Sequence, residues 1–212
     1  MVTLNQSKME TQLSMFGEGS GVSDTQDFYL LTINPSWEVS KYVSGLKKSH
    51  QAFLGAGFGL ASKPHITVAG FPLYAGQLGL FSRRLEAICR KWNEIKIDVN
   101  GFRTFDNSST ICLNVLPNDS LYALYLNIAH FMRNELRAEA SHWPRSYTPH
   151  ITVVRNLDRL DESVYQQLWT AYEEKDYTGD FIADKLVLLK YKANGVGTDL
   201  CREFKLGGEA YN

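Results

Sequence analysis

The sequence Pro64-His65-Ile66-Thr67-Val68 occurs a second time, with identical residues, at Pro149–Val153. The chain has 212 residues, so the two copies stand far apart within it. A repeat at such a distance indicates an internal duplication, in which each part of the chain carries the same structural unit. Each unit would then contribute one imidazole and one hydroxyl at matching positions.

The spacing inside the repeat predicts which side chains share a face. Residues i and i+2 of a strand point to the same side of a sheet. His65 and Thr67 therefore face one side, and Ile66 and Val68 face the other. The apolar pair suits burial under helices, whereas the polar pair suits a cleft. Proline before the histidine is tolerated because the first residue of a strand needs no ladder donor.

Hydrophobic periodicity predicts a chain of alternating strands and helices between residues 27 and 212, preceded by a polar, flexible tail at residues 1–26. The expected strands are Asp27–Ile33, Ser62–Phe71, Ile95–Phe105, Thr110–Val115, Thr148–Arg155, Phe181–Lys190 and Cys201–Leu206. Helices are expected after Asn34-Pro35, over about Leu78–Trp92, after Asp119, and from about Asp161 to Tyr172. This order favours an α+β fold with two similar lobes side by side, each with helices on one face of its sheet.

Composition narrows the class of protein. The formal net charge is −1, so no global positive field attracts long nucleic acids. No apolar run is long enough to cross a membrane, and no signal peptide is evident. Cys89, Cys112 and Cys201 are widely spaced, which predicts small buried residues in a reducing cytoplasm rather than disulfides or a zinc site. We expect a cytoplasmic protein.

Two facing imidazoles suit a reaction that removes a proton at one end and delivers one at the other. Imidazole has an ordinary pKa near 6.5, so it serves as acid or base near neutrality. Hydrolysis or transesterification at phosphorus has this requirement. Thr67 and Thr152 could donate to phosphate oxygens whose charge grows in the transition state. No carboxylate cluster suggests a metal, so neither a metal nor another cofactor is expected.

These residues resemble the 2H phosphoesterase superfamily, which is named for two His-hydrophobic-Thr/Ser-hydrophobic motifs. Within it the chain looks most like the bacterial 2′-5′ RNA ligase branch, also described as RNA 2′,3′-cyclic phosphodiesterases. The resemblance covers about Asp27 to Gly207. It implies a bilobed, duplicated αβ fold with two antiparallel sheets around a central pseudo-twofold cleft.

The resemblance also implies roles for individual residues. His65 and His150 would be the acid/base pair, and Thr67 and Thr152 would bind phosphate oxygens. The branch often carries an arginine five residues after the second histidine, where Arg155 stands as a candidate phosphate clamp. An aromatic residue often follows the first motif, which makes Phe71 a candidate for stacking on a base, and Tyr147 is a candidate for the cleft wall.

The implied activity is metal-independent opening of 2′,3′-cyclic phosphates at RNA or nucleotide ends, with 2′-5′ joining as the reverse reaction. Two alternatives stay open. The same residues could hold a nucleotide or RNA end without turnover, or the enzyme could hydrolyse another cyclic or 2′-5′-linked nucleotide. A duplication retained for packing alone would explain Ile66 and Val68, but not the histidines and threonines.

The tail contains a second motif. Gln12-Leu13-Ser14-Met15-Phe16 resembles the short peptide by which bacterial proteins dock on the DNA polymerase sliding clamp. Such a peptide places Leu13 and Phe16 in a groove, with Gln12 beside them. We therefore expect weak docking to the clamp as an additional partner contact, and we expect the protein to be a monomer.

Overall fold

The computed structural model describes residues 26–54, 59–105, 110–135, 147–155, 160–193 and 197–207. The tail residues Gln12, Leu13 and Phe16 lie outside these ranges, so the clamp motif stays a prediction. The strands are β1 (Gln26–Ile33), β2 (Ile66–Tyr74), β3 (Ile95–Phe105), β4 (Thr110–Val115), β5 (His150–Val154), β6 (Thr178–Ala183), β7 (Lys185–Tyr191) and β8 (Thr198–Lys205). The helices are α2 (Trp37–Leu54), α3 (Leu78–Cys89), α4 (Asp119–Glu135) and α5 (Glu162–Glu173), with a short 3-10 turn η1 (Ala75–Gln77).

The strands of the described chain form one curled antiparallel sheet in the order β6-β3-β4-β5-β2-β1-β7-β8. The predicted α+β class is confirmed. The two sheets expected from the duplication are present as half-sheets, joined where β2 pairs with β5. We call β6-β3-β4-β5 the β5 half-sheet and β2-β1-β7-β8 the β2 half-sheet. The sheet therefore has its two motif strands at its centre.

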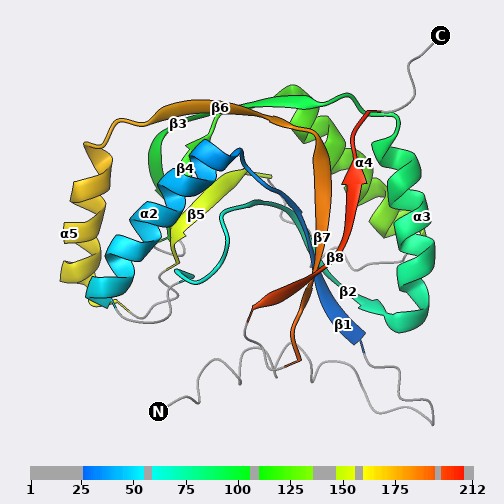
Figure 1. Ribbon diagram of the computed structural model, residues 1–212, viewed down its shortest axis with the longest axis horizontal. Coiled ribbons are helices and arrows are strands. Elements are labelled where there is room, and N and C mark those ends of the chain that lie inside the picture. Colours follow the sequence, from blue (N-terminus) through cyan, green and yellow to red (C-terminus); the bar gives the residue numbers. More distant parts are fainter. Residues whose placement is uncertain are drawn as a thin grey trace.

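The helices pack in crossed fashion over the two half-sheets. The pair α2 and α5 lies on one side of the molecule and the pair α3 and α4 on the other (Figure 1). Helix α2 follows β1 in sequence but contacts β5, and α5 contacts β3. Helix α3 contacts β8 and α4. Each half-sheet is therefore covered partly by a helix from the other half of the duplication, which locks the two halves together.

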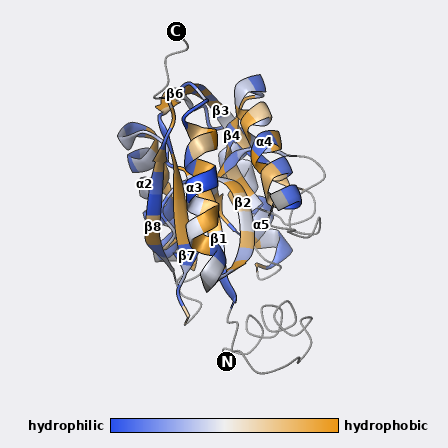
Figure 2. Ribbon diagram, turned by 90° about the vertical axis from the view of Figure 1, so that its right-hand side faces the viewer, coloured by the Kyte–Doolittle hydropathy of each residue, from blue (hydrophilic) through white to orange (hydrophobic). Residues whose placement is uncertain are grey.

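Burial follows the period of each element. Apolar and polar residues alternate along α3 and α4, as expected for helices with one buried face (Figure 2). In α3 the buried positions include Phe81, Leu85 and Cys89, spaced four residues apart. Phe81 contacts Phe71 of β2 and Phe131 of α4, with ring centroids 5.1 and 5.8 Å apart. These contacts build the core between the β2 half-sheet and its helices.

One predicted element is wrong. The single strand expected over Phe181–Lys190 is two strands, β6 and β7, which are separated by Asp184. Strand β6 pairs with β3 and β7 pairs with β1, so the chain crosses here from one half-sheet to the other. The segment runs over the top of the molecule in Figure 1. Hydrophobic pattern alone does not show the change of partner.

The remaining structural expectations are mixed. Cys89 and Cys112 are buried free thiols, as predicted, but Cys201 on β8 is exposed. Burial raises the pKa of both buried thiols to about 12, so they are unreactive at neutral pH. None of the helices in the described ranges combines the length and apolar character that a bilayer crossing requires.

Candidate active site

The two copies of the repeat meet at the centre of the sheet. Strands β2 and β5 are antiparallel, and their pairing joins Ile66 to Ile151, the same residue of each copy. A pseudo-twofold axis therefore passes through this pair. Both isoleucine side chains are fully buried. His65 and His150 follow on the opposite face, where both are half-buried.

The register also sets the neighbours of each histidine. In an antiparallel pair centred on Ile66 and Ile151, His65 stands beside Thr152 and Thr67 stands beside His150. The two histidines are then diagonal neighbours, whose Cα atoms are typically about 7–8 Å apart. Thr67 is exposed and Thr152 is half-buried. The structure thus brings together the four residues that the motif predicted.

A backbone hydrogen bond orients each imidazole. His65 Nδ1 lies 2.8 Å from the carbonyl oxygen of Lys63, and His150 Nδ1 lies 2.9 Å from that of Thr148. A carbonyl oxygen can only accept, so each Nδ1 carries the hydrogen. The Nε2 atom of each neutral ring then carries the free lone pair. Both histidines therefore have the same nitrogen, Nε2, available to accept a proton.

The environment of both rings disfavours the protonated imidazolium form. Burial lowers the pKa of His65, and the charges of Lys47 and His150 lower it further, against the Lys63 hydrogen bond. Burial also lowers the pKa of His150, with a contribution from Arg103. An anionic phosphate between the rings would act in the opposite direction, because it favours an imidazolium.

A bulge follows each motif. The pairing of β1 with β2 skips Val68, and the pairing of β4 with β5 skips Val153, the same position of the repeat. An extra residue shifts the alternation of a strand by one. The fifth residue after each histidine, Gly70 or Arg155, therefore takes the histidine face.

This bulge corrects the expectation for Phe71. Strict alternation would give Phe71 the same face as His65, but the shift turns it into the helix-side core. Its side chain is fully buried, 5.1 Å from the Phe81 ring and 6.4 Å from the Tyr29 ring by centroids. A base cannot stack on it. The exposed aromatic side chain near Gly70 is instead Phe28, which would lie 3.3 Å from a Cβ at that glycine.

Tyr147 also packs differently from the expectation. Its ring stacks on Tyr125 of α4, with centroids 4.2 Å apart and an interplanar angle of 6°. Its hydroxyl is buried without a hydrogen-bond partner in the described part of the chain, and burial raises its pKa. Tyr147 thus anchors the approach to β5 on a helix, and its hydroxyl does not line an open cleft.

Arg155 follows β5 directly and is exposed. Its Cβ would lie 3.2 Å from a Cβ at Gly59, which has a φ of +72°. The end of the second motif therefore lies against the turn that precedes the first motif. The predicted role of Arg155 as a phosphate clamp is compatible with this position.

Sequence reasoning missed two residues of β3. The Phe105 ring meets the His150 ring edge to face, with centroids 4.8 Å apart. The Arg103 guanidinium carbon lies 4.8 Å from the centroid of Phe105. Thr104 between them bonds Tyr165 of α5 on the helix side. The alternation of Arg103 and Phe105 was visible in the sequence, but their distance from His150 along the chain gave no reason to connect them.

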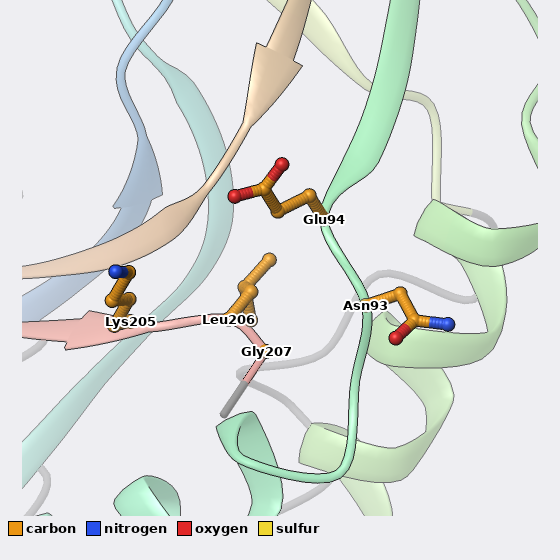
Figure 3. Close-up of a pocket in the computed structure, with 5 residues that line it drawn as sticks. All are labelled: Asn93, Glu94, Lys205, Leu206 and Gly207. Carbon is orange, nitrogen blue, oxygen red and sulfur yellow. The ribbon is translucent and has the colours of Figure 1, made fainter. Parts of the chain in front are cut away.

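A pocket found elsewhere in the described structure does not contain residues of either repeat. This pocket, lined by Asn93, Glu94, Lys205, Leu206 and Gly207, lies at the start of β3 and the end of β8 (Figure 3). None of these residues belongs to a motif strand. No group of three or more His, Cys, Asp or Glu side chains within the described ranges is arranged to hold a metal ion.

Comparisons with known proteins agree with this geometry. The sequence model described as "2'-5' RNA ligase superfamily" matches residues 37–195. The protein TT0787 of Thermus thermophilus is similar in structure, with a TM-score of 0.66 and 14% identity over 86% of this chain and 100% of that one.

Two structures of E. coli LigT are also similar. The complex with NADP+ has a TM-score of 0.61 and 14% identity over 87% of this chain and 100% of that one. The complex with 3'-AMP has a TM-score of 0.61 and 14% identity over 86% of this chain and 99% of that one. No curated protein sequence matches significantly.

Proposed function

Because the chain belongs to the 2′-5′ RNA ligase superfamily, we propose that it is a phosphodiesterase that opens 2′,3′-cyclic phosphates at RNA or nucleotide ends. The observation that carries the proposal is the central strand pair. It sets two imidazoles diagonally across a pseudo-twofold axis, each with Nδ1 held by a carbonyl and Nε2 free. This is the arrangement required for one base and one acid on opposite sides of a phosphorus atom.

In the proposed reaction, one Nε2 removes a proton from water. The water oxygen forms a bond to phosphorus, and the bond from phosphorus to the 3′ oxygen breaks. The other imidazole, protonated, gives its proton to that leaving oxygen, and the product carries a 2′-phosphate. The reverse reaction replaces water by the 5′-hydroxyl of a second RNA end and uses the same groups.

Side chains around the histidines would stabilise the negative charge on the phosphate oxygens in the transition state. Thr67 and Thr152 can donate to the non-bridging phosphate oxygens, on which charge accumulates. The exposed guanidinium of Arg155 can clamp the same oxygens through two parallel hydrogen bonds. These groups supply acid, base and charge stabilisation from the chain itself, so the proposal invokes no metal.

The substrate is expected to lie asymmetrically. On the histidine face, β1 and β7 of the β2 half-sheet carry Leu30 and Leu189, both half-buried, and the exposed Phe28. Phe28 packs edge to face on Tyr191, with centroids 5.7 Å apart. An apolar platform with an exposed aromatic ring suits a nucleobase. Complexes of E. coli LigT with 3'-AMP and NADP+ are compatible with a nucleotide as ligand.

The proposal is tested with 2′,3′-cyclic nucleotides and an RNA with a cyclic phosphate end, in the presence of EDTA. Turnover to the 2′-phosphate is expected for the wild type and is expected to fall sharply in His65→Ala and His150→Ala. His130→Ala removes an exposed histidine of α4 and serves as the matched control. Binding of these ligands without turnover would instead support a nucleotide-binding module. Full activity in either motif variant, or loss of activity with EDTA, would contradict the mechanism.

A further inference from the structure

Lys47 of α2 is a buried cation close to the active site. Its side chain is 3% exposed, and it is the charged residue among the buried polar residues that the structure describes. Burial lowers its pKa to about 8. A buried ammonium is expensive compared with a methionine or leucine of similar size, so packing alone does not account for a lysine here.

The ammonium is held by one turn of the chain. Lys47 Nζ donates to the carbonyl oxygens of Gly59 and Ser62, at 3.1 and 2.8 Å, and to Ser62 Oγ at 2.9 Å. Ser62 Oγ in turn donates to the Gly59 carbonyl at 2.6 Å. Three donors thus meet three acceptors, and none of the ion pairs within the described ranges involves Lys47. Its charge remains uncompensated by a carboxylate there.

This turn touches both copies of the motif. Ser62 is followed by Lys63, whose carbonyl accepts the hydrogen bond from His65 Nδ1. At its other end, Gly59 packs closely on Arg155, directly after β5. Lys47 therefore ties down the segment that orients the first histidine and supports the arginine that follows the second motif.

Lys47 also acts on His65 through its charge. Its positive charge disfavours a second positive charge on the imidazole, and His150 on β5 adds to this effect. Arg103 on β3 acts on His150 in the same sense. Arg155 stands beyond the turn, against Gly59. Each catalytic imidazole therefore has its own cation, one from a helix and one from a strand.

We propose that Lys47 is a positioning residue of the active site, which fixes the ring of His65 through the turn at residues 59–62. The inference rests on the proposed acid/base role of His65. It assigns to a buried helix residue, outside both motifs, control over the tautomer of one catalytic group.

The test compares Lys47→Met with Lys48→Met, the neighbouring exposed lysine on the same helix. The first readout is NMR titration of the imidazoles in the full chain without substrate. In Lys47→Met the pKa of His65 is expected to rise, because a positive charge is removed, and Nδ1 is expected to lose its full protonation. The titration of His150 should change less. Lys48→Met should titrate like the wild type.

The second readout is the dependence of kcat/KM on pH with a 2′,3′-cyclic nucleotide. Lys47→Met should lower kcat/KM by about 10-fold or more and move to higher pH whichever limb of the profile reports His65. Lys47→Arg, which keeps charge and donors, should restore part of both. If Lys47→Met does not fold, Ser62→Ala removes one acceptor and should produce the tautomer change in a milder form.

The outcomes separate this inference from the proposed function. An unchanged pKa and tautomer of His65 in folded Lys47→Met, with only a lower melting temperature, would overturn the positioning role. If Lys47→Met does not fold, an unchanged tautomer in Ser62→Ala would overturn it equally. The absence of turnover in the wild type would overturn the proposed function, while the NMR titration would still decide whether Lys47 controls His65.

Discussion

The two half-sheets are related by the duplication but differ on the face that carries the histidines. Moving outward from the central pair, Arg103 of the β5 half-sheet occupies the place of Val187 in the β2 half-sheet. Arg155 similarly stands where the first copy has Gly70. The β5 half-sheet therefore carries arginines at two positions where the β2 half-sheet carries a valine and a glycine.

The aromatic residues differ in the same direction. Phe105 of β3 corresponds by register to Leu189 of β7, and the Phe105 ring meets the ring of His150. The β2 half-sheet places its aromatic ring farther out, at Phe28. Both halves keep a histidine, a threonine and a bulged valine at the same positions. In the proposed reaction, the difference assigns proton transfer to residues that both halves share, and binding of phosphate and nucleoside to residues in which the halves differ.

The largest effects should come from the residues that the halves share. His65→Ala and His150→Ala are each expected to lower kcat/KM by about 10²–10⁴-fold, because each removes one partner of the proton transfer. The double variant should be little worse than either single variant, since the two act as a unit. Steady-state kinetics of all three measure this. If the loss in the double variant equalled the product of the two single losses, the two histidines would act independently, which would contradict their proposed joint role.

The threonines should give the next largest effect, again equal in the two halves. Thr67→Val and Thr152→Val are each expected to lower kcat by about 10²-fold with little change in KM, because a hydroxyl donor acts mainly in the transition state. Separate determination of kcat and KM tests this. A loss confined to one of the two would show that a single half binds the phosphate oxygens.

Variants of the residues that differ between the two half-sheets should distinguish binding of the phosphate from binding of the nucleobase. Arg155→Ala is expected to lower kcat/KM by roughly 10–100-fold for every substrate, because one charge-assisted contact to phosphate is lost. Arg155→Lys should recover only part, since an ammonium lacks the planar fork. The measurement is kcat/KM with 2′,3′-cyclic AMP and with a ribose 2′,3′-cyclic phosphate that has no base. Equal activity of Arg155→Ala and the wild type would contradict the proposed role of Arg155 in binding phosphate.

Phe28→Ala should instead act through the base. We expect about a 10-fold rise in KM for 2′,3′-cyclic AMP and almost no change for the base-free substrate. Phe28→Tyr keeps the ring and serves as the control. An equal loss on both substrates would place the nucleoside elsewhere on the sheet.

The smallest predicted effect is on stability. Burial lowers the pKa values of His50, His65 and His150 below the ordinary value. The unfolded chain therefore binds more protons than the folded chain as the pH falls below about 6.5, so the free energy of unfolding decreases there. The melting temperature should drop by a few degrees between pH 7.5 and 5.5, and less so in the His65→Ala/His150→Ala double variant. An equal drop in both proteins would show that the site histidines do not contribute.

Much of the centre of the molecule could be predicted from the sequence, because the alternation of polar and apolar residues within the repeat shows which side chains share a face. His65, Thr67, His150 and Thr152 share a face by local alternation alone, and that face is where the structure has them. Helix positions were also predictable from periodicity, although Asn118 rather than Asp119 caps α4.

The failures have a common cause in long-range pairing. The bulge at Val68 depends on how β1 aligns with β2, and no local pattern shows it, so local alternation could not place Phe71 in the core. The division of Phe181–Lys190 into β6 and β7 depends on pairing with two strands in different half-sheets. Lys47 lies far along the chain from the motif that it supports.

The central claim is that His65 and His150, one from each half, act together as the base and the acid of one reaction. Its most direct test is the pH dependence of kcat/KM. For the wild type with a 2′,3′-cyclic nucleotide and EDTA, the account predicts a bell with limbs of unit slope, one for each imidazole. The residual activity of His65→Ala should lack one limb and that of His150→Ala the other. A bell that persists unchanged in either variant, or a wild-type profile with a single limb, would contradict the account.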